Sequence, residues 1–164
     1  NYGPFQDTEK FIPRMITNLV EGKNIMIYGD GKYVRDWLHV EDHCSAIEAV
    51  IKKGKVGETY LVGGQLKETN NLEIARKILA LFNFDNSKLT FVKDRPGHDR
   101  RYAVDWRKIK KELDWNPKFD FEEGITKTVE WYRENKWWWG EMTKTSEKFY
   151  SKAASSAYAK TGQK

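Results

Sequence analysis

Residues 93–102, KDRPGHDRRY, concentrate side chains that bind anions. Arg95, Arg100 and Arg101 carry planar guanidinium groups, and each such group can hold two oxygens of a phosphate, which lysine does with less geometric selectivity. The stretch contains no aliphatic residue, so it fits neither a core strand nor the apolar face of a helix. These residue types fit a loop that grips a pyrophosphate.

The remaining residues of this loop fit the same chemistry. Pro96 and Gly97 force a bend, and glycine lets a ligand approach the backbone closely. His98 can donate a hydrogen bond to a phosphate or a hydroxyl. The alternative is a solvated charged loop in which Asp94 and Asp99 pair locally with its cations.

A second cluster precedes this loop, in IYGDGKYVRDWLHVED at residues 27–42. In an extended segment, the alternation of side chains places Tyr33, Arg35 and Trp37 on one face. An arginine between two aromatic rings can stack on them and still offer its guanidinium to an anion. The alternative is an edge-strand arginine paired with Asp36 or Asp42.

Strands and helices are expected to alternate along the chain, which predicts an α/β fold. Apolar spacing and turn residues predict the elements in chain order. The first half has a helix at 9–20, a strand at 24–28, an extended segment at 33–40 and a helix capped by Asp42 and closed by Gly54. The second half has a strand at 58–64, a helix at 72–81 capped by Asn70 or Asn71, a strand at 89–92, a helix capped by Asp105 and a helix begun by Asp120. From about residue 139 the composition becomes rich in Thr, Ser, Lys and Ala. We expect residues 139–164 to be a flexible or weakly helical tail.

The composition narrows the functional classes. The formal net charge of +5 over 164 residues argues only weakly for anionic ligands. Cys44 is the single cysteine, which excludes an internal disulfide and a cysteine-rich zinc site and fits a reducing, cytoplasmic location. His39 and His43 straddle a change from strand to helix, so we expect no metal site. No apolar run reaches the length of a membrane span, so no membrane association is expected.

Several catalytic motifs are absent from the sequence. It has no GxGxxG, no GxxxxGK[ST] and no nucleophile elbow. Tyr28 and Lys32 have the Tyr-x-x-x-Lys spacing, but this tyrosine enters a Gly-Asp-Gly turn rather than a helix. We therefore expect no catalytic residue in this chain.

The chain resembles the dTDP-glucose 4,6-dehydratase family, in the nucleotide-sugar branch of the extended short-chain dehydrogenases. The DRPGH form of the loop, with His98, is closest to this family. The resemblance covers residues 1 to about 138, and its motifs are NYGPFQ, EKFIP, YGDGKYVRDWLHVEDH, GETYLVGG, TNNLEIA, FVKDRPGHDRRYAVD and ELDWNPKFDFEEGITKTVEWY. It implies a substrate-binding lobe together with the last elements of an incomplete Rossmann sheet.

The resemblance also implies roles for particular residues. Asn1 would lie near the nicotinamide of NAD, and Lys10 and Phe11 would border the substrate. Met26, Ile27 and Tyr28 would flank the thymine, although Met26 stands where the family usually has proline. Arg35 and the loop residues Asp94, Arg95, Pro96, Gly97 and His98 would hold the diphosphate. Asn70 and Asn71 both precede Leu72, and Asn71 is the better match to the substrate asparagine.

The implied function is that of the C-terminal, dTDP-sugar-binding part of an NAD-dependent lyase. The enzyme converts dTDP-glucose to dTDP-4-keto-6-deoxyglucose, in deoxysugar biosynthesis. The Rossmann half that binds NAD and carries the catalytic residues would precede Asn1, so this chain alone is expected to be inactive and the full-length enzyme to be a homodimer. The alternatives are the same region of a UDP-sugar epimerase or decarboxylase, and a basic nucleic-acid-binding module over residues 93–111. The interleaved acidic residues argue against nucleic acid as a partner.

Overall fold

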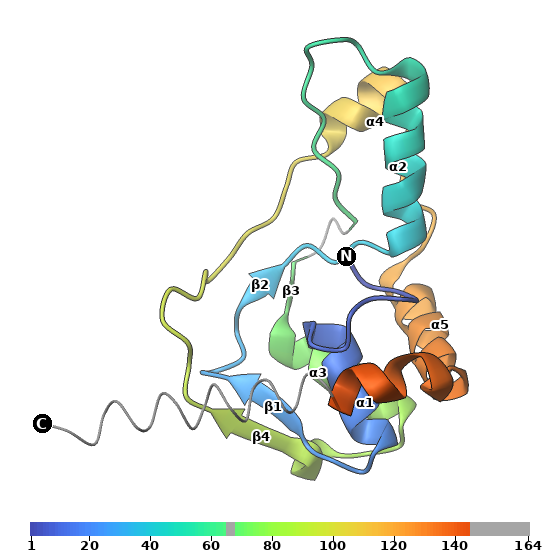
Figure 1. Cartoon of the computed structure of the whole chain (residues 1–164). Coiled ribbons are helices and arrows are strands. Elements are labelled where there is room, and N and C mark those ends of the chain that lie inside the picture. The colour runs from blue at the N-terminus through green and yellow to red at the C-terminus, as the bar shows by residue number, and fades with distance from the viewer. Residues whose placement is uncertain (65–67, 145–164) are drawn as a thin grey trace, which may run out of the picture.

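The structure, a computed structural model, describes residues 1–64 and 68–144 (Figure 1). Its elements in chain order are α1 (Phe11–Val20), β1 (Ile25–Tyr28), β2 (Val34–Arg35), α2 (Val40–Lys53), β3 (Thr69–Asn70), α3 (Asn71–Leu81), the 3-10 turn η1 (Asn86–Lys88), β4 (Leu89–Val92), α4 (Arg107–Leu113) and α5 (Phe121–Glu134). Residues 136–144 are also helical. The expected α/β class is confirmed.

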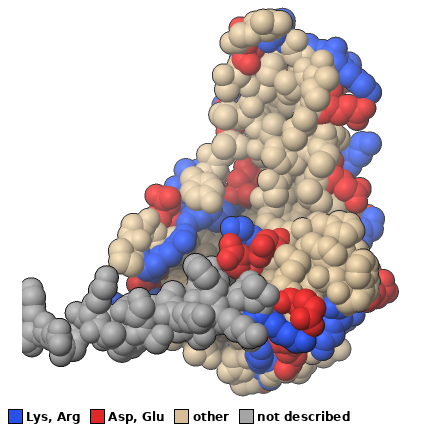
Figure 2. All heavy atoms as spheres, in the orientation of Figure 1, with Lys and Arg blue, Asp and Glu red and all other residues tan. Residues whose placement is uncertain are grey.

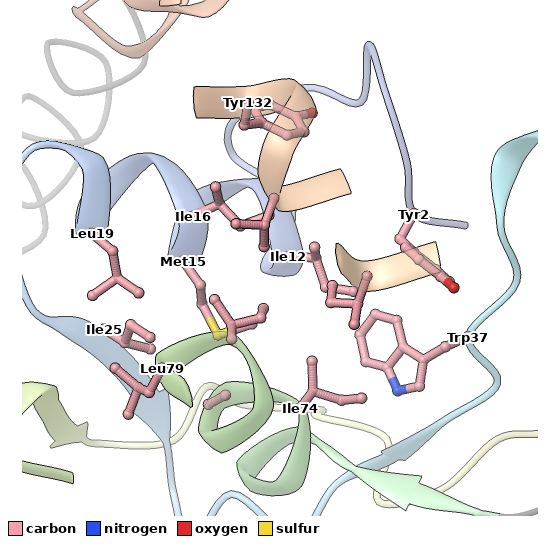
Figure 3. Close-up of a cluster of buried hydrophobic side chains, with 14 of the residues drawn as sticks. Tyr2, Ile12, Met15, Ile16, Leu19, Ile25, Trp37, Ile74, Leu79 and Tyr132 are labelled. Atoms are coloured by element: carbon pink, nitrogen blue, oxygen red, sulfur yellow. The ribbon is translucent and has the colours of Figure 1, made fainter. Parts of the chain in front are cut away.

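A large lobe forms around α1, α3, α5, β1 and β4 (Figure 1). The 3- and 4-residue spacing of apolar residues in α1 turns Ile12, Ile16 and Leu19 toward the core that Figure 3 shows. Pro13 is tolerated because it lies in the first turn, where the backbone N–H has no partner within the helix. α3 and α5 cover the same core with Ile74, Leu79, Tyr132 and their buried neighbours.

The β1–β4 pair lies at one side of this lobe. The two strands are parallel, with Ile25 opposite Leu89 and Tyr28 opposite Val92. Alternate β1 residues are buried and exposed, so Ile25 and Ile27 enter the core while Met26 faces outward. β4 then delivers the chain into the loop of residues 93–106, which runs along the side of the molecule to α4 (Figure 1).

A short second sheet stands between the two ends of the molecule. β2 pairs with β3 in antiparallel fashion, with Val34 opposite Asn70. On its other side Val34 donates to Arg100 O and accepts from Tyr102 N, at 3.0 and 3.3 Å. The arginine-rich segment 93–102, called the cationic loop below, is therefore attached by its backbone to β2.

A small lobe contains α2, residues 54–64 and α4 (Figure 1). It packs around a second apolar cluster, which consists of Leu38, Ala46, Trp106, Ile109, Leu113 and Trp115. Trp115 Nε1 donates to Ser45 Oγ of α2 at 2.8 Å, which fixes the chain after α4 against that helix.

Three sequence predictions in the small lobe are wrong, and one concerns α4, whose N-cap residue is Trp106 rather than Asp105. Asp42 does not cap α2, because the helix begins two residues earlier and the His39 side chain accepts from Glu41 N. The buried Asp42 carboxylate instead accepts from the backbone N–H groups of Lys118 and Phe119, at 2.8 and 3.1 Å. The segment 58–64 is not a strand, since no described strand lies beside it to complete a ladder. In the expected extended segment 33–40, Val34 and Arg35 form β2, His39 makes a single parallel bridge with Tyr2, and Val40 already begins α2.

The last described helix extends the packed region beyond residue 138. Trp139 is fully buried in the large core, and its Nε1 donates to Tyr132 O at 2.7 Å. Thr143 is buried one turn later. The tail that was expected from residue 139 therefore does not begin there, because residues 139–144 belong to a packed helix. The rest of the expected tail, 145–164, lies outside the described residues.

Candidate pyrophosphate-binding site

Asp94 organises the start of the cationic loop. One carboxylate oxygen, Oδ1, accepts from Arg95 N at 2.9 Å and lies 2.8 Å from His98 Nδ1. The other, Oδ2, accepts from the Tyr33 hydroxyl. The hydrogen bond from Tyr33, and after it the one from His98, lowers the pKa of Asp94, so this carboxyl is ionised at neutral pH. Asp94 thus acts as an internal support of the loop.

His98 is held in one orientation by aromatic contacts as well. Its ring stacks on Tyr33 with centroids 3.7 Å apart, and Tyr28 approaches it edge-on at 6.5 Å. Only 6% of the His98 side chain is exposed. Donation from Nδ1 to Asp94 leaves Nε2 as the nitrogen that can meet a ligand.

Arg35 connects the loop to β2. Its guanidinium donates to Val34 O and Asp99 O, both at 2.7 Å, and lies over the Tyr102 ring with Cζ 4.2 Å from the centroid. The predicted stacking of Arg35 on aromatic rings is therefore present, but the partner is Tyr102 rather than Tyr33 or Trp37. Arg35 thus holds the loop through Asp99 O, and the N–H groups that these two bonds do not use remain available to an anion.

The three loop arginines differ in how they are engaged. Arg100 makes a two-pronged pair with Asp30, at 2.7 and 3.0 Å, and Arg101 pairs with Glu68. The bond from Arg100 lowers the pKa of Asp30 to about 2. Arg95 has no side-chain hydrogen bond or ion pair within residues 1–64 and 68–144. Of the three, Arg95 is therefore the one whose guanidinium is uncommitted, and it is also the one to which the family resemblance assigns a diphosphate contact.

The structure separates the two candidate asparagines at the start of α3. Asn70 caps the helix: its Oδ1 accepts from Glu73 N at 2.9 Å, and Glu73 returns a bond to Asn70 N. Asn71 Oδ1 is buried and accepts no hydrogen bond from the described residues. A buried acceptor without a donor is costly, so the Asn71 side chain is the one suited to a ligand.

The expected base-flanking residues divide according to the strand pattern. Met26 and Tyr28 are exposed on the outer face of β1, and Tyr28 lies beside His98. Ile27 points into the core and is almost fully buried, so its side chain is not available to a ligand. Among these three positions, the structure offers two side chains and the backbone of the third.

Lys10 and Phe11, which were expected to border the substrate, lie at the start of α1, and Asn1, which was expected near the nicotinamide, lies in the first loop. Phe11 stacks on Trp37 with centroids 5.8 Å apart, and Lys10, at the start of α1, pairs with Glu9 on the surface. Trp37 Nε1 is buried without an acceptor among the described residues. Asn1 is exposed, and its carbonyl accepts from Gln6 Nε2 at 2.7 Å.

Sequence reasoning missed two residues that shape the site. Tyr33 was placed on a face with Arg35 and Trp37, yet its hydroxyl and ring hold Asp94 and His98. Asp30, in the Gly-Asp-Gly turn, anchors Arg100 from 70 residues away. Pairings between a turn and a distant loop leave no periodic signal in the sequence. The concentration of opposite charges in the two segments is the one hint available.

Asn1 is the single position for which a nicotinamide contact was expected, and the glycine-rich turn that holds a dinucleotide pyrophosphate does not occur in the sequence. Within residues 1–64 and 68–144, no three His, Cys, Asp or Glu side chains converge closely enough to hold a metal ion. No helix in the same ranges is long and apolar enough to cross a bilayer.

Comparisons with known proteins agree with these features. The family model of GDP-mannose 4,6 dehydratase matches residues 1–128. A dTDP-glucose 4,6-dehydratase of Mycolicibacterium smegmatis is 48% identical over 151 residues, covering 92% of this chain and 45% of that protein. One from Xanthomonas campestris is 49% identical over 147 residues, covering 84% and 42%. The chain thus spans less than half the length of the curated relatives it matches.

Solved structures give the same picture. The dTDP-glucose 4,6-dehydratase of Bacillus anthracis, in complex with NAD, superposes with a TM-score of 0.83 at 51% identity, covering 87% of this chain and 45% of that one. A UDP-glucose 4-epimerase of Thermotoga maritima superposes less closely, with a TM-score of 0.76 at 29% identity, covering 82% and 43%. The resemblance seen in the sequence is confirmed, and the chain belongs to the GDP-mannose 4,6 dehydratase family.

Proposed function

We propose that this chain is the part of an NAD-dependent dTDP-glucose 4,6-dehydratase that binds the dTDP portion of the substrate. The complete enzyme is a lyase, because the conversion of dTDP-glucose to dTDP-4-keto-6-deoxyglucose is a net loss of water. Lys10, Phe11, Met26, Tyr28, Arg35, Asn71 and residues 94–98 are the proposed substrate contacts, with Ile27 contributing backbone alone.

The observation that carries this proposal is the prepared cationic loop. Arg95 is uncommitted, His98 is fixed with Nδ1 on Asp94, and Arg35 attaches the loop to β2. Figure 2 shows Lys and Arg gathered on the side of the molecule along which the loop runs. A diphosphate would receive charge-assisted hydrogen bonds from groups that are already in place, which lowers the entropic cost of binding.

The proposed contribution to catalysis is positional. Binding energy from the nucleotide, remote from the reacting carbons, orients the sugar for chemistry performed elsewhere in the protein. The sequence lacks the glycine-rich turn that holds a dinucleotide pyrophosphate, so we assign most of the NAD site and the acid–base groups to the part of the enzyme outside this chain. We expect this chain alone to be inactive and to show no micromolar NAD binding in a calorimetric titration. The complete enzyme is proposed to be a cytoplasmic homodimer, which sedimentation would test.

The pattern of charge pairs argues against the nucleic-acid alternative. Arg100, Arg101, Arg107 and Lys108 each pair with a carboxylate, on Asp30, Glu68, Asp105 and Glu58 respectively. Such pairing reduces the positive field that a polyanion needs. A thermal-shift comparison of dTDP, UDP and single-stranded DNA separates the dehydratase from an epimerase and from a nucleic-acid-binding module.

The decisive experiment measures dTDP affinity in the complete gene product that contains this chain. Arg95→Ala and Arg35→Ala should each weaken binding by about tenfold to a hundredfold, as expected for the loss of charge-assisted bonds. Lysine at either position should restore only part of the affinity, because the charge remains without the planar fork. Lys108→Ala is the matched control, since Lys108 pairs with Glu58 in the small lobe. An equal loss in Lys108→Ala would contradict a specific diphosphate site.

A further inference from the structure

Tyr33 lies where three segments of the candidate site meet. It directly precedes β2, and its backbone carbonyl accepts from Asn71 N, at the start of α3, at 2.9 Å. Its hydroxyl donates to Asp94 Oδ2 in the cationic loop. One buried tyrosine therefore connects the asparagine and the loop that are expected to contact the same ligand, although 23 residues separate Asn71 and Asp94 in the sequence.

The Tyr33 ring supports the cationic loop independently of its hydroxyl. His98 stacks on it with an interplanar angle of 15°, and Arg100 Cζ lies 4.9 Å from its centroid. Gly29 makes room for this arrangement, because a Cβ at that position would stand 3.2 Å from the Tyr33 hydroxyl and 3.4 Å from Asp94 Cβ. Gly29 also has a positive φ of 58°, which glycine adopts without strain.

We propose that Tyr33 is a positioning residue for the ligand-binding loop, holding Asp94 through its hydroxyl and His98 through its ring. The His98 imidazole is thereby kept with Nδ1 toward Asp94 and Nε2 toward the diphosphate. This inference rests on the proposed function, since it names the residue that keeps the proposed diphosphate ligands in their binding arrangement before substrate arrives.

The two ring nitrogens of His98 can exchange roles unless the surrounding structure fixes them. A neutral imidazole carries its proton on one nitrogen, and the hydrogen bond of the other ring nitrogen decides which. Asp94 Oδ1 can accept the hydrogen bond from His98 Nδ1 only while the carboxylate stays beside the imidazole. The Tyr33 hydroxyl holds the carboxylate there by donating to its other oxygen, Oδ2. The stacking of the His98 ring on the Tyr33 ring also prevents the imidazole from rotating away from Asp94. Loss of Tyr33 should therefore loosen His98 without removing any group that touches the ligand.

The test uses three variants of the complete gene product. Tyr33→Phe removes the hydroxyl and keeps the ring, while Tyr33→Leu removes both. Tyr60→Phe is the matched control, because the Tyr60 hydroxyl also donates to a carboxylate, that of Glu112, at 3.1 Å in the small lobe. Dissociation constants for dTDP, KM and kcat for dTDP-glucose, and melting temperatures are measured for each.

We expect Tyr33→Phe to raise the dissociation constant for dTDP and the KM by about threefold to tenfold, and Tyr33→Leu by about tenfold to thirtyfold. The kcat should stay within about twofold, because the reacting groups are untouched. Tyr60→Phe should leave dTDP affinity unchanged. Equal affinities for Tyr33→Leu and the unmutated protein, or an equal loss in Tyr60→Phe, would overturn the proposal.

A second readout needs no ligand. The ring ¹⁵N resonances of His98 should show the Nδ1–H form in the unmutated protein and a mixture of both tautomers in Tyr33→Leu. Unchanged His98 spectra in Tyr33→Leu would refute the positioning role even if Arg95→Ala weakens dTDP binding as proposed. Absence of dTDP binding by the unmutated protein would instead overturn the proposed function, while the histidine spectra still decide whether Tyr33 positions His98.

Discussion

The large lobe encloses an extensive core of buried apolar residues, whereas the small lobe has a much smaller buried core and exposes several large apolar side chains. α1, α3 and α5 surround one core that includes Ile16, Ile78 and Tyr132. In the small lobe the exposed large apolar residues are Ile47, Ile51, Val56 and Leu61. Figure 2 shows that the face of this lobe turned to the viewer is mostly free of charged groups.

The two lobes also differ in their backbone pairing. β4 completes a ladder with β1, while residues 59–63 make no backbone–backbone hydrogen bond with any other described residue. Unpaired extended backbone next to exposed apolar side chains is typical of a surface that another strand or chain covers. The difference in buried core indicates that the large lobe is the better stabilised of the two, and we expect the small lobe to need contacts beyond this chain.

The largest effect is expected in the large core, at its last described tryptophan. Trp139→Ala should lower the free energy of unfolding by about 3–5 kcal/mol, because it removes a fully buried ring and leaves a cavity. Trp137→Ala is the matched control: this side chain is 75% exposed in the same run of tryptophans. Urea denaturation of both variants measures the difference. Equal effects would show that residues 136–144 are not packed in solution.

A smaller effect is expected where the two lobes join. Asp42→Ala should lower stability by about 1–3 kcal/mol, because it leaves the N–H groups of Lys118 and Phe119 without their acceptor. Glu41→Ala changes an exposed neighbour in the same helical turn and should have little effect. If thermal denaturation shows the same shift for both, Asp42 does not connect the lobes.

The exposed face of the small lobe leads to a prediction about association. The isolated chain should aggregate or pair with another chain, and Ile51→Glu should reduce this while changing the free energy of unfolding by less than about 0.5 kcal/mol. Glu48→Gln, on the same helix, is a control that adds no charge to the apolar face. Analytical ultracentrifugation measures the association. A monodisperse monomer that melts cooperatively would contradict the proposed dependence of the small lobe.

The smallest effect is expected on the pH dependence of stability, through two aspartates that form ion pairs with arginines. Hydrogen bonds from Arg100 and Arg107 lower the pKa values of Asp30 and Asp105, each to about 2. A lowered pKa in the folded state adds stability above the ordinary aspartate pKa, and this stability is lost as the pH falls toward 2. Asp105 lies two residues from its arginine, so its pair persists on unfolding better than the Asp30 pair does. Asp30→Asn should therefore reduce the pH dependence of stability between about pH 4 and 2 more than Asp105→Asn.

The sequence predicted the elements of the large lobe well because its periodic signals coincide with its packing. Apolar spacing located α1, α3 and α5, and Asp120 begins α5 as expected, with its Oδ1 accepting from Glu123 N. The sequence failed at 58–64, where an apolar run indicates a buried strand but a strand needs a neighbour to pair with. It also misjudged Asp42, since a buried carboxylate and an N-cap look the same in the sequence.

The candidate site was predictable in its residue types and not in its internal contacts. The cationic loop and Arg35 follow from charge and turn chemistry, whereas a ligand contact by Asn70 or Asn71 was implied by the family resemblance. Which arginine is uncommitted and how Tyr33 meets His98 depend on contacts between distant segments. Such contacts are decided by tertiary packing, for which local propensity carries no information.

The parallel pairing of β1 with β4 has a consequence for how the protein is made. The ladder encloses a loop of about 60 residues, whose closure costs about 4 kcal/mol of chain entropy in a simple polymer estimate. The core then still lacks Ile125, Tyr132 and Trp139, which are synthesised after β4. During translation the apolar stripe of α1 therefore stays partly uncovered until α5 and residues 136–144 have left the ribosome. Over that interval α1 is the segment that a chaperone would be expected to bind.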